Sequence, residues 1–228
     1  METIDLASTK LRDMHAQLHA LPEDTNRTAW RVLNPRGAHA VAVGLAAPIN
    51  VTVEGHVGYY AAGMNTRAKI TIAGNAGVGL AENMMSGEVR LRGDASMSAG
   101  ATGRGGLLVI EGSAAARCGI SMKGIDIAVR GNVGHMSGFM AQSGTLLVCG
   151  NAGDALGDSL YEAKIFVRGT VTSLGADCEE KPITVADRAT LESLLTRAAF
   201  TDIDPGEFRL YGSARRLYHF HVDNAQAY

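Results

Sequence analysis

The sequence predicts an all-β fold, a parallel β-helix of about seven coils, because three features recur at one fixed spacing. Glycine stands at every nineteenth residue: Gly55, Gly74, Gly93, Gly112, Gly131, Gly150 and Gly169. The positions two and four before each glycine are all aliphatic, and the positions three and seven after it are small. A short strand with one buried face, followed by a tight bend, explains all three columns.

Stacking each strand on the equivalent strand of the preceding coil aligns the aliphatic columns into continuous interior ladders. A left-handed hexapeptide helix is a weaker interpretation, since nineteen is not a multiple of six. A leucine-rich repeat would show a Leu/Asn consensus, which is absent. The columns do not encode handedness, and we expect a right-handed β-helix.

The chain before the repeat predicts one short helix. Leu11, Met14, Leu18 and Leu21 lie at helical spacing within residues 5–21, so we expect an amphipathic helix there. A loop should follow and lead into a first strand near Val41 and Val43. Residues 1–37 are therefore interpreted as an N-terminal helical extension and lead-in, and residues 38–178 as the β-helix.

The chain after the repeat, residues 179–228, predicts a second helix and an aromatic tail. The segment Thr184-Val-Ala-Asp187 resembles a capping box, and apolar residues at helical spacing follow it as far as Ala198. Half of the chain's aromatic residues lie beyond residue 199. They either cap the β-helix locally or form an arm that docks on another subunit.

Two outward-facing columns carry further expectations. The column just before the repeat glycine contains Arg92, Glu111 and Arg130 in successive coils, which predicts a charge ladder across neighbouring strands. The column three before the glycine turns apolar after the third coil, so the C-terminal helix or a partner protein must cover it. The candidate interface residues are Val109, Leu147, Phe166, Phe208, Tyr211, Tyr218, Phe220 and Tyr228.

Bulk properties exclude several classes of protein. The formal net charge of −2 argues against charge-driven binding to nucleic acid or to a membrane surface. No apolar run approaches the length of a membrane span, and the first thirty residues do not resemble a secretion signal. The three cysteines, Cys118, Cys149 and Cys178, suggest neither a disulfide framework nor a metal site. We expect a cytoplasmic protein.

No motif predicts a catalytic, cofactor-binding or metal-binding residue in this chain. The glycine-rich segments 74–79 and 103–106 precede further strands, whereas a nucleotide-binding loop requires a helix. His219 and His221 have no third ligand near them in the sequence, and His135 is more simply a surface residue. Two charged runs are interpreted as solvated surface, with an interface as the alternative for the acidic one: Asp154, Asp158 and Glu162, and Arg104, Arg117, Lys123 and Arg130.

The repeat resembles the GXGXG domain, the right-handed β-helix at the C-terminal end of the large subunit of glutamate synthase. The segments that carry the resemblance are GYYAAGMN, AENMMSG, GATGRGGLLVI, RCGISMKGIDI and GDALGDSLYEAKIFVRG. A chain of this length with the start NPRGAHAVAVG and the end YGSARRLYHFHVDNAQAY looks most like the β-helix subunit of N-methylglutamate synthase (methylamine–glutamate N-methyltransferase). That enzyme converts methylamine and L-glutamate to N-methyl-L-glutamate and ammonia.

The resemblance implies a divided enzyme, in which this chain is a non-catalytic scaffold that carries no cofactor itself. One partner would resemble a class II glutamine amidotransferase, and another the flavin domain of glutamate synthase, with FMN and iron–sulfur clusters. The start Met1-Glu2-Thr3 lacks the N-terminal nucleophilic cysteine of the amidotransferase. The alternative is the β-helix subunit of a formyltransferase/hydrolase or formylmethanofuran dehydrogenase complex in one-carbon metabolism.

Overall fold

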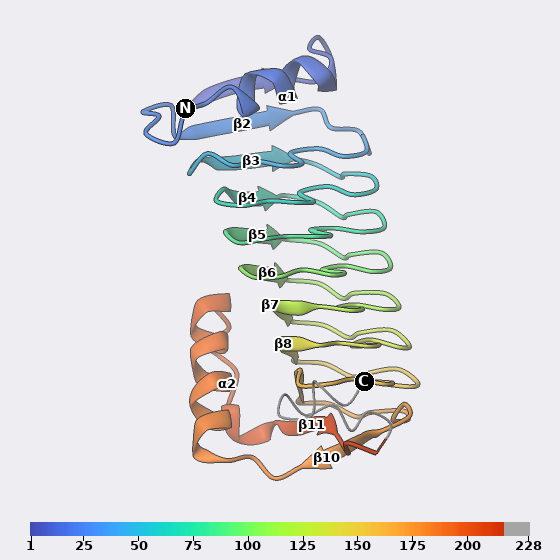
Figure 1. The fold of residues 1–228 in the computed structure, drawn as a ribbon. Helices are drawn as coiled ribbons and strands as arrows, with labels where there is room; N and C mark the ends of the chain where they lie inside the picture. The colour runs from blue at the N-terminus through green and yellow to red at the C-terminus, as the bar shows by residue number, and fades with distance from the viewer. Residues whose placement is uncertain (217–228) are drawn as a thin grey trace, which may run out of the picture.

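A computed structural model of the protein describes residues 1–216, and the chain forms a stack of coils whose strands make one sheet (Figure 1). The helices are α1 (Leu11–His19), α2 (Val185–Ala198) and the 3-10 turn η1 (Pro205–Glu207). The strands are β1 (Glu2–Asp5), β2 (Ala29–Leu33), β3 (Asn50–Glu54), β4 (Lys69–Ile72), β5 (Glu88–Leu91), β6 (Leu107–Ile110), β7 (Lys123–Val129), β8 (Ser143–Val148), β9 (Lys164–Val167), β10 (Cys178–Lys181) and β11 (Arg209–Ser213).

The register of the sheet confirms the parallel β-helix and its nineteen-residue period. Strands β1 to β9 pair in parallel in sequence order, and Ile70 of β4 pairs with Val51 of β3 on one side and Val89 of β5 on the other. The two aliphatic columns of these strands are at most 1 % exposed. The repeat therefore builds interior ladders, as expected; the right-handed sense stays a prediction.

The repeat glycines are required because neighbouring coils touch through them. Gly131 N donates a hydrogen bond to Gly112 O at 2.9 Å, and the same bond recurs from Gly93 to Gly169. A Cβ atom placed on Gly131 would lie 2.8 Å from Gly112 O, closer than real Cβ atoms approach backbone. Any larger residue in this column would force two coils apart.

The bends contain a second ladder and a run of left-handed residues. Val57, Ala76 and Ala95 begin a chain of isolated parallel bridges that continues to Val171. Five positions later, in the first six of these coils, the backbone has positive φ, as at Ala62 (55°), Ala81 (55°) and Gly100 (70°). The column of alanine and glycine seven after each repeat glycine is thereby explained.

A polar ladder that was not predicted runs beside the glycines. The side chain that follows each repeat glycine accepts a hydrogen bond from the backbone N–H one coil further on: Asn75 Oδ1 from Asp94 N at 3.0 Å, and Asp94 Oδ1 from Ser113 N at 2.7 Å. The series starts at His56 and ends at Thr170. These bonds satisfy backbone groups that the short strands leave unpaired.

The sheet begins earlier than the repeat. Strands β1 and β2 pair in parallel with each other, and β2 pairs with β3, so part of the expected N-terminal extension belongs to the sheet. The strand expected near Val41 and Val43 is absent, because this segment forms a bend with positive φ at Ala40 and Ala42. The apolar side of α1, with Met14 and Leu18 almost fully buried, closes the N-terminal end of the core.

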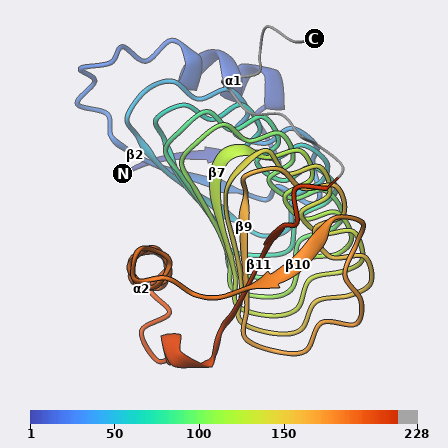
Figure 2. The same ribbon diagram turned by 60° about the horizontal axis from the view of Figure 1, so that its bottom comes forward.

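At the other end the chain reverses direction. Strand β11 pairs antiparallel with both β9 and β10, so it lies between them in the sheet (Figure 2). The predicted capping box begins α2: the Thr184 hydroxyl accepts from Asp187 N at 3.2 Å, and Asp187 Oδ2 accepts from Thr184 N at 3.0 Å. Helix α2 then runs along the outer face of the later strands.

Candidate functional site

The apolar outer face of the later strands is covered by the chain's own helix. Val109, Leu147 and Phe166 are all 0 % exposed, and they form one cluster with the apolar face of α2. The sequence left two possible covers for this face, the C-terminal helix and a partner protein. In the structure, α2 packs on it. A partner would therefore meet the outer surface of α2 rather than these three residues, which lie inside the fold.

Two aromatic residues expected at an interface also lie inside the chain. Phe208 is 4 % exposed and Tyr211 is 3 % exposed, because η1 and β11 fold them against the end of the β-helix. The other three aromatic candidates, Tyr218, Phe220 and Tyr228, lie outside the described residues, as do His219 and His221.

A belt of ion pairs ties α2 and the segment after it to the sheet. Arg197 contacts Asp126 at 2.6 Å, Arg130 contacts Asp202 at 2.5 Å, and Arg168 contacts Glu207 at 2.5 Å. The Arg130 guanidinium also lies 5.3 Å from the centre of the Phe200 ring. Charge neutralisation and stacking thus position the helix, and each of these arginines is already engaged.

The expected charge ladder forms in part. Glu111 contacts Arg92 at 3.7 Å and Arg90 at 3.4 Å. Arg130, the other expected neighbour of Glu111, instead forms its ion pair with Asp202. These side chains, with Ala198, Ala199 and Phe200, line a shallow cleft of about 370 Å³ at the C-terminal end of α2. Arg90 also donates to Ala198 O at 3.0 Å, so the positive charges in this cleft serve to hold the helix.

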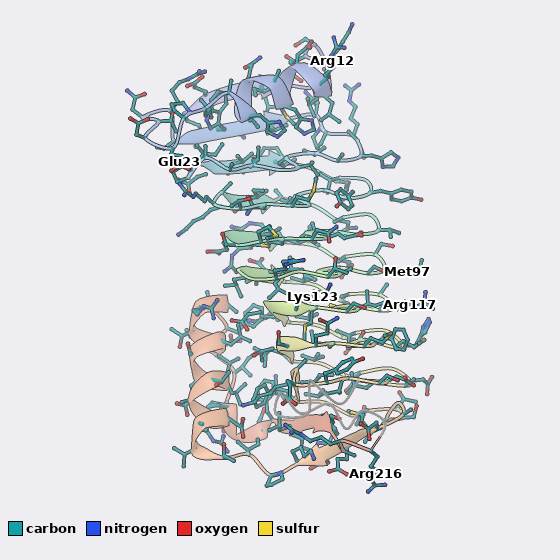
Figure 3. The ribbon with its side chains drawn as sticks, in the orientation of Figure 1. Arg12, Glu23, Met97, Arg117, Lys123 and Arg216 are labelled. Atoms are coloured by element: carbon teal, nitrogen blue, oxygen red, sulfur yellow. The ribbon has the colours of Figure 1, made fainter. Side chains whose placement is uncertain are left out.

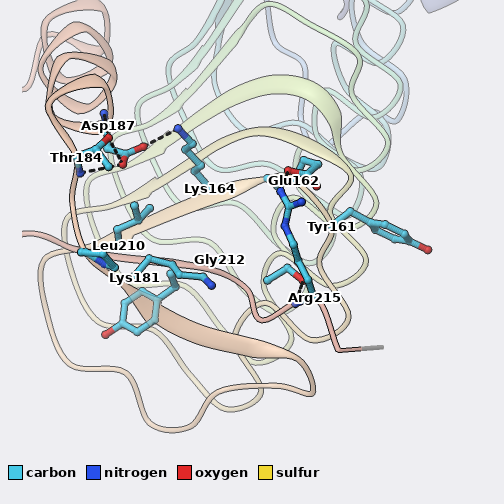
Figure 4. Close-up of a pocket in the computed structure, with 13 residues that line it drawn as sticks. Tyr161, Glu162, Lys164, Lys181, Thr184, Asp187, Leu210, Gly212 and Arg215 are labelled. Atoms are coloured by element: carbon cyan, nitrogen blue, oxygen red, sulfur yellow. Dashed lines mark hydrogen bonds and ion pairs between the residues drawn. The ribbon is translucent and has the colours of Figure 1, made fainter. Parts of the chain in front are cut away.

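A larger pocket of about 440 Å³ lies where the last coil meets β11 and the start of α2 (Figure 4). Its charged groups are paired: Lys164 Nζ lies 2.5 Å from Asp187, and Arg215 lies 2.7 Å from Glu162. Burial alone would raise the pKa of Asp187, but hydrogen bonds from Lys164 and Thr184 lower it to about 2. The carboxylate is therefore a fixed negative charge rather than a proton donor or acceptor near neutral pH.

The acidic run in the sixth coil has a structural role. Asp158 accepts hydrogen bonds from Ser159 Oγ at 2.7 Å and Ala176 N at 3.1 Å, and Asp154 accepts from Ser173 Oγ at 3.2 Å. These carboxylates bind the last coil to the one before it.

The described part of the chain offers little nucleophilic or metal-binding chemistry. No group of three histidine, cysteine or acidic side chains within residues 1–216 could hold a metal ion. Burial raises the pKa of Cys118, Cys149 and Cys178 to about 12, which leaves them as protonated thiols. Burial also lowers the pKa of His15, whose ring stacks on His19 at 5.4 Å.

One edge of the molecule differs from these satisfied regions. In each coil the tight bend exposes side chains on the side away from α2, and Figure 3 shows Met97 and Arg117 along it. We call this surface the bend edge and define it by residues 59–64, 78–83, 97–102, 116–121 and 135–140. Four of its side chains are exposed and apolar: Tyr59 (59 %), Met64 (45 %), Met97 (47 %) and Met140 (37 %).

Comparison with known proteins gives one strong match. The chain is 61 % identical over 228 residues to Protein GlxC of Rhizobium meliloti (strain 1021), and the alignment covers 100 % of both chains. No family model matches the chain, and no solved structure matches it. None of the helices within residues 1–216 has the length and apolar character needed to cross a bilayer.

Proposed function

The chain belongs to the family of Protein GlxC, and we propose that it is a non-catalytic scaffold subunit of a glutamate-synthase-like complex. In this proposal it holds an amidotransferase-like subunit and a flavin subunit, with FMN and iron–sulfur clusters, in fixed positions. The complex is N-methylglutamate synthase, which forms N-methyl-L-glutamate from methylamine and L-glutamate. The chain itself binds no cofactor, and the complex is cytoplasmic.

The observation that carries the proposal is that most of the chain forms one rigid surface. Nine parallel strands stack in sequence order, which spans about 38 Å at the usual strand spacing. Glycine contacts between coils and the polar ladder leave this stack little freedom to bend. A rigid wall of this length suits the positioning of two other proteins.

The state of the charged groups supports the same function. The side chains that line the two clefts are held in ion pairs and hydrogen bonds that fasten α2 and the last coil. A catalytic site instead needs side chains that are free to contact a substrate and whose pKa values are shifted to suit proton transfer.

The test is affinity purification of the tagged full-length chain from its native cells. We expect an amidotransferase-like protein and a flavoprotein to co-purify with it. The eluate should show the visible absorption of flavin and iron–sulfur clusters and should have N-methylglutamate synthase activity. The same chain made alone in a foreign host should be colourless and inactive. Activity of the lone chain would contradict the scaffold role, and capture of one-carbon-transferring subunits would assign it to the formyl-transfer alternative.

A further inference from the structure

The bend edge carries two charged side chains that have no ion-pair partner among residues 1–216, Glu82 in the second coil and Arg117 in the fourth. Both contrast with the other arginines and acids near the sheet, most of which are paired. Burial without a partner cation raises the pKa of the Glu82 carboxyl. Arg117 is exposed, and its neighbours at the same place in adjacent coils are the uncharged Ser98 and Met136.

These two charges occupy equivalent places on the bend. Arg117 stands five residues after its repeat glycine, at positive φ. The same place in the second coil is Gly79, and a Cβ atom there would lie 2.7 Å from Glu82 Oε2. The Glu82 carboxylate therefore lies where the side chain of residue 79 would be. The negative and positive charges flank the third coil, one coil to each side of Met97.

Two pairs of exposed side chains on the bend edge are also alike in kind on either side of the same coil. Residues equidistant from the third coil, at the same place in the bend, are Tyr59 with His135, Tyr60 with Met136, and Met64 with Met140. Tyr59 and His135 are both exposed rings, and Met64 and Met140 are both exposed thioethers. The third coil itself contributes Met97, which is 47 % exposed.

We propose that the bend edge binds a second copy of this chain, antiparallel, about a twofold axis that passes through the third coil at Met97. A twofold axis makes each contact between two different residues occur twice, once in each direction. Glu82 of one copy then meets Arg117 of the other twice, Met97 meets Met97, and the methionines and aromatic rings pack around them. A foreign protein would not require the edge to match itself in this way.

The bend is stiff enough to present such a surface. Backbone hydrogen bonds close the turns of the edge, such as Gly63 N to Tyr60 O at 3.3 Å and Ile120 N to Arg117 O at 3.1 Å. Asn83 donates to the Tyr60 hydroxyl at 3.0 Å and accepts from Thr102 at 2.6 Å, which links three coils. Five stacked coils span only about 19 Å from the first to the last, so we expect a weak, concentration-dependent dimer.

Analytical ultracentrifugation of the purified full-length chain, from micromolar to millimolar concentration, tests this proposal without partner subunits. Wild type should shift from monomer to dimer over this range. Glu82→Arg and Arg117→Glu should each raise the dissociation constant about tenfold or more, because like charges then face each other at both contacts. The double variant Glu82→Arg/Arg117→Glu restores opposite charges and should recover most of the lost affinity.

A matched pair of methionine variants supplies the control. Met97→Lys places two ammonium groups at the axis and should abolish dimerisation. Met85 is nearly as exposed as Met97, at 46 %, but it lies in the column that contains Lys123, which Figure 3 places away from the bend edge. Met85→Lys should therefore leave the dissociation constant of the dimer unchanged. Circular dichroism and melting temperature verify that the variants fold.

Three results would overturn the proposal. The wild-type chain could be a monomer at every concentration, or Met97→Lys and Met85→Lys could change the dissociation constant equally. The third is a double variant Glu82→Arg/Arg117→Glu that dimerises no more tightly than the single variants. If the wild-type chain is a monomer and the Met97→Lys variant fails to capture partner subunits in the affinity purification, the bend edge binds a different protein. Failure of dimerisation leaves the scaffold function intact, since affinity purification tests that separately.

Discussion

The contact between repeat glycines predicts a large effect for a single added methyl group. In Gly131→Ala the new Cβ would lie 2.8 Å from Gly112 O and 2.4 Å from Ser113 Oγ. Neither neighbour can yield freely. The oxygen accepts the Gly131 N–H at 2.9 Å, and the hydroxyl accepts from Asn132 N at 3.1 Å.

The cost follows from the distances. To reach an ordinary contact of 3.4 Å, the two coils must separate locally by about half an ångström, which stretches the backbone hydrogen bond beyond its normal range. The Ser113 hydroxyl must also rotate away from Asn132 N. Two weakened hydrogen bonds cost about 1–3 kcal/mol together, and overpacking costs about 1–3 kcal/mol more. We expect a loss of about 3 kcal/mol, or roughly 6–12 °C in melting temperature for a chain of this size.

The assay is thermal and urea unfolding followed by far-ultraviolet circular dichroism, with Gly212→Ala as the control. A Cβ on Gly212 would meet Lys181 Cγ at 3.4 Å, an ordinary contact with a flexible side chain, and its φ is not in the left-handed region. The control should melt within about 2 °C of wild type. If Gly131→Ala is as stable as Gly212→Ala, the reasoning about direct glycine contact is refuted.

Three further changes test the interior, the sheet face beneath α2 and the Lys164–Asp187 ion pair. Val129→Asp places an unpaired carboxylate in a 0 % exposed ladder and should destabilise by several kcal/mol; melting within a degree or two of wild type would refute the assignment of this column. Phe166→Ala should cost about 3–5 kcal/mol and speed amide exchange in α2, and unchanged exchange there would mean that the helix docks without this ring. The pKa of Asp187 falls from 3.8 to about 2 on folding, so its contribution is complete above about pH 4 and lost as the pH falls through 2. Asp187→Asn should therefore cost about 2 kcal/mol at pH 7 and nothing near pH 1.5, and a pH-independent difference would contradict the Lys164–Asp187 pair.

The regular part of the fold could be predicted because each coil repeats the same physical problem. One aliphatic pair per strand, one glycine at the contact and three left-handed residues in the bend recur at a single spacing, so their alignment determines the register. The polar ladder could have been found in the same way. His56, Asn75, Asp94, Ser113 and their successors all follow a repeat glycine, and all carry a side-chain acceptor.

The ends of the sheet were not predicted because they break this spacing. Glu2 pairs with Trp30 and Trp30 with Val51, separations that no internal repeat indicates. The segment around Val41 has strand-like alternation, but positive φ at Ala40 and Ala42 bends it. Strand β11 follows α2 in the chain yet lies between β9 and β10, a long-range pairing that local pattern does not encode.

The candidate surfaces, too, were predictable from the sequence only in part. The apolar column at Val109, Leu147 and Phe166 was visible in the sequence, and so were its two possible covers. Only the fold shows that α2 reaches it, through ion pairs such as Arg197–Asp126 between residues far apart in the chain. The bend edge was missed because its pairing about the third coil is apparent only when the coils are stacked.

Reconstitution from purified components tests the scaffold role most directly. The amidotransferase-like and flavin subunits would be mixed with and without this chain, and each mixture separated by size-exclusion chromatography with mass detection. The account predicts that the two subunits elute together only when the chain is present, in fixed proportion to it, and that formation of N-methyl-L-glutamate from methylamine and L-glutamate appears in the same fraction. Stable association and full activity of the two subunits in its absence would contradict the account.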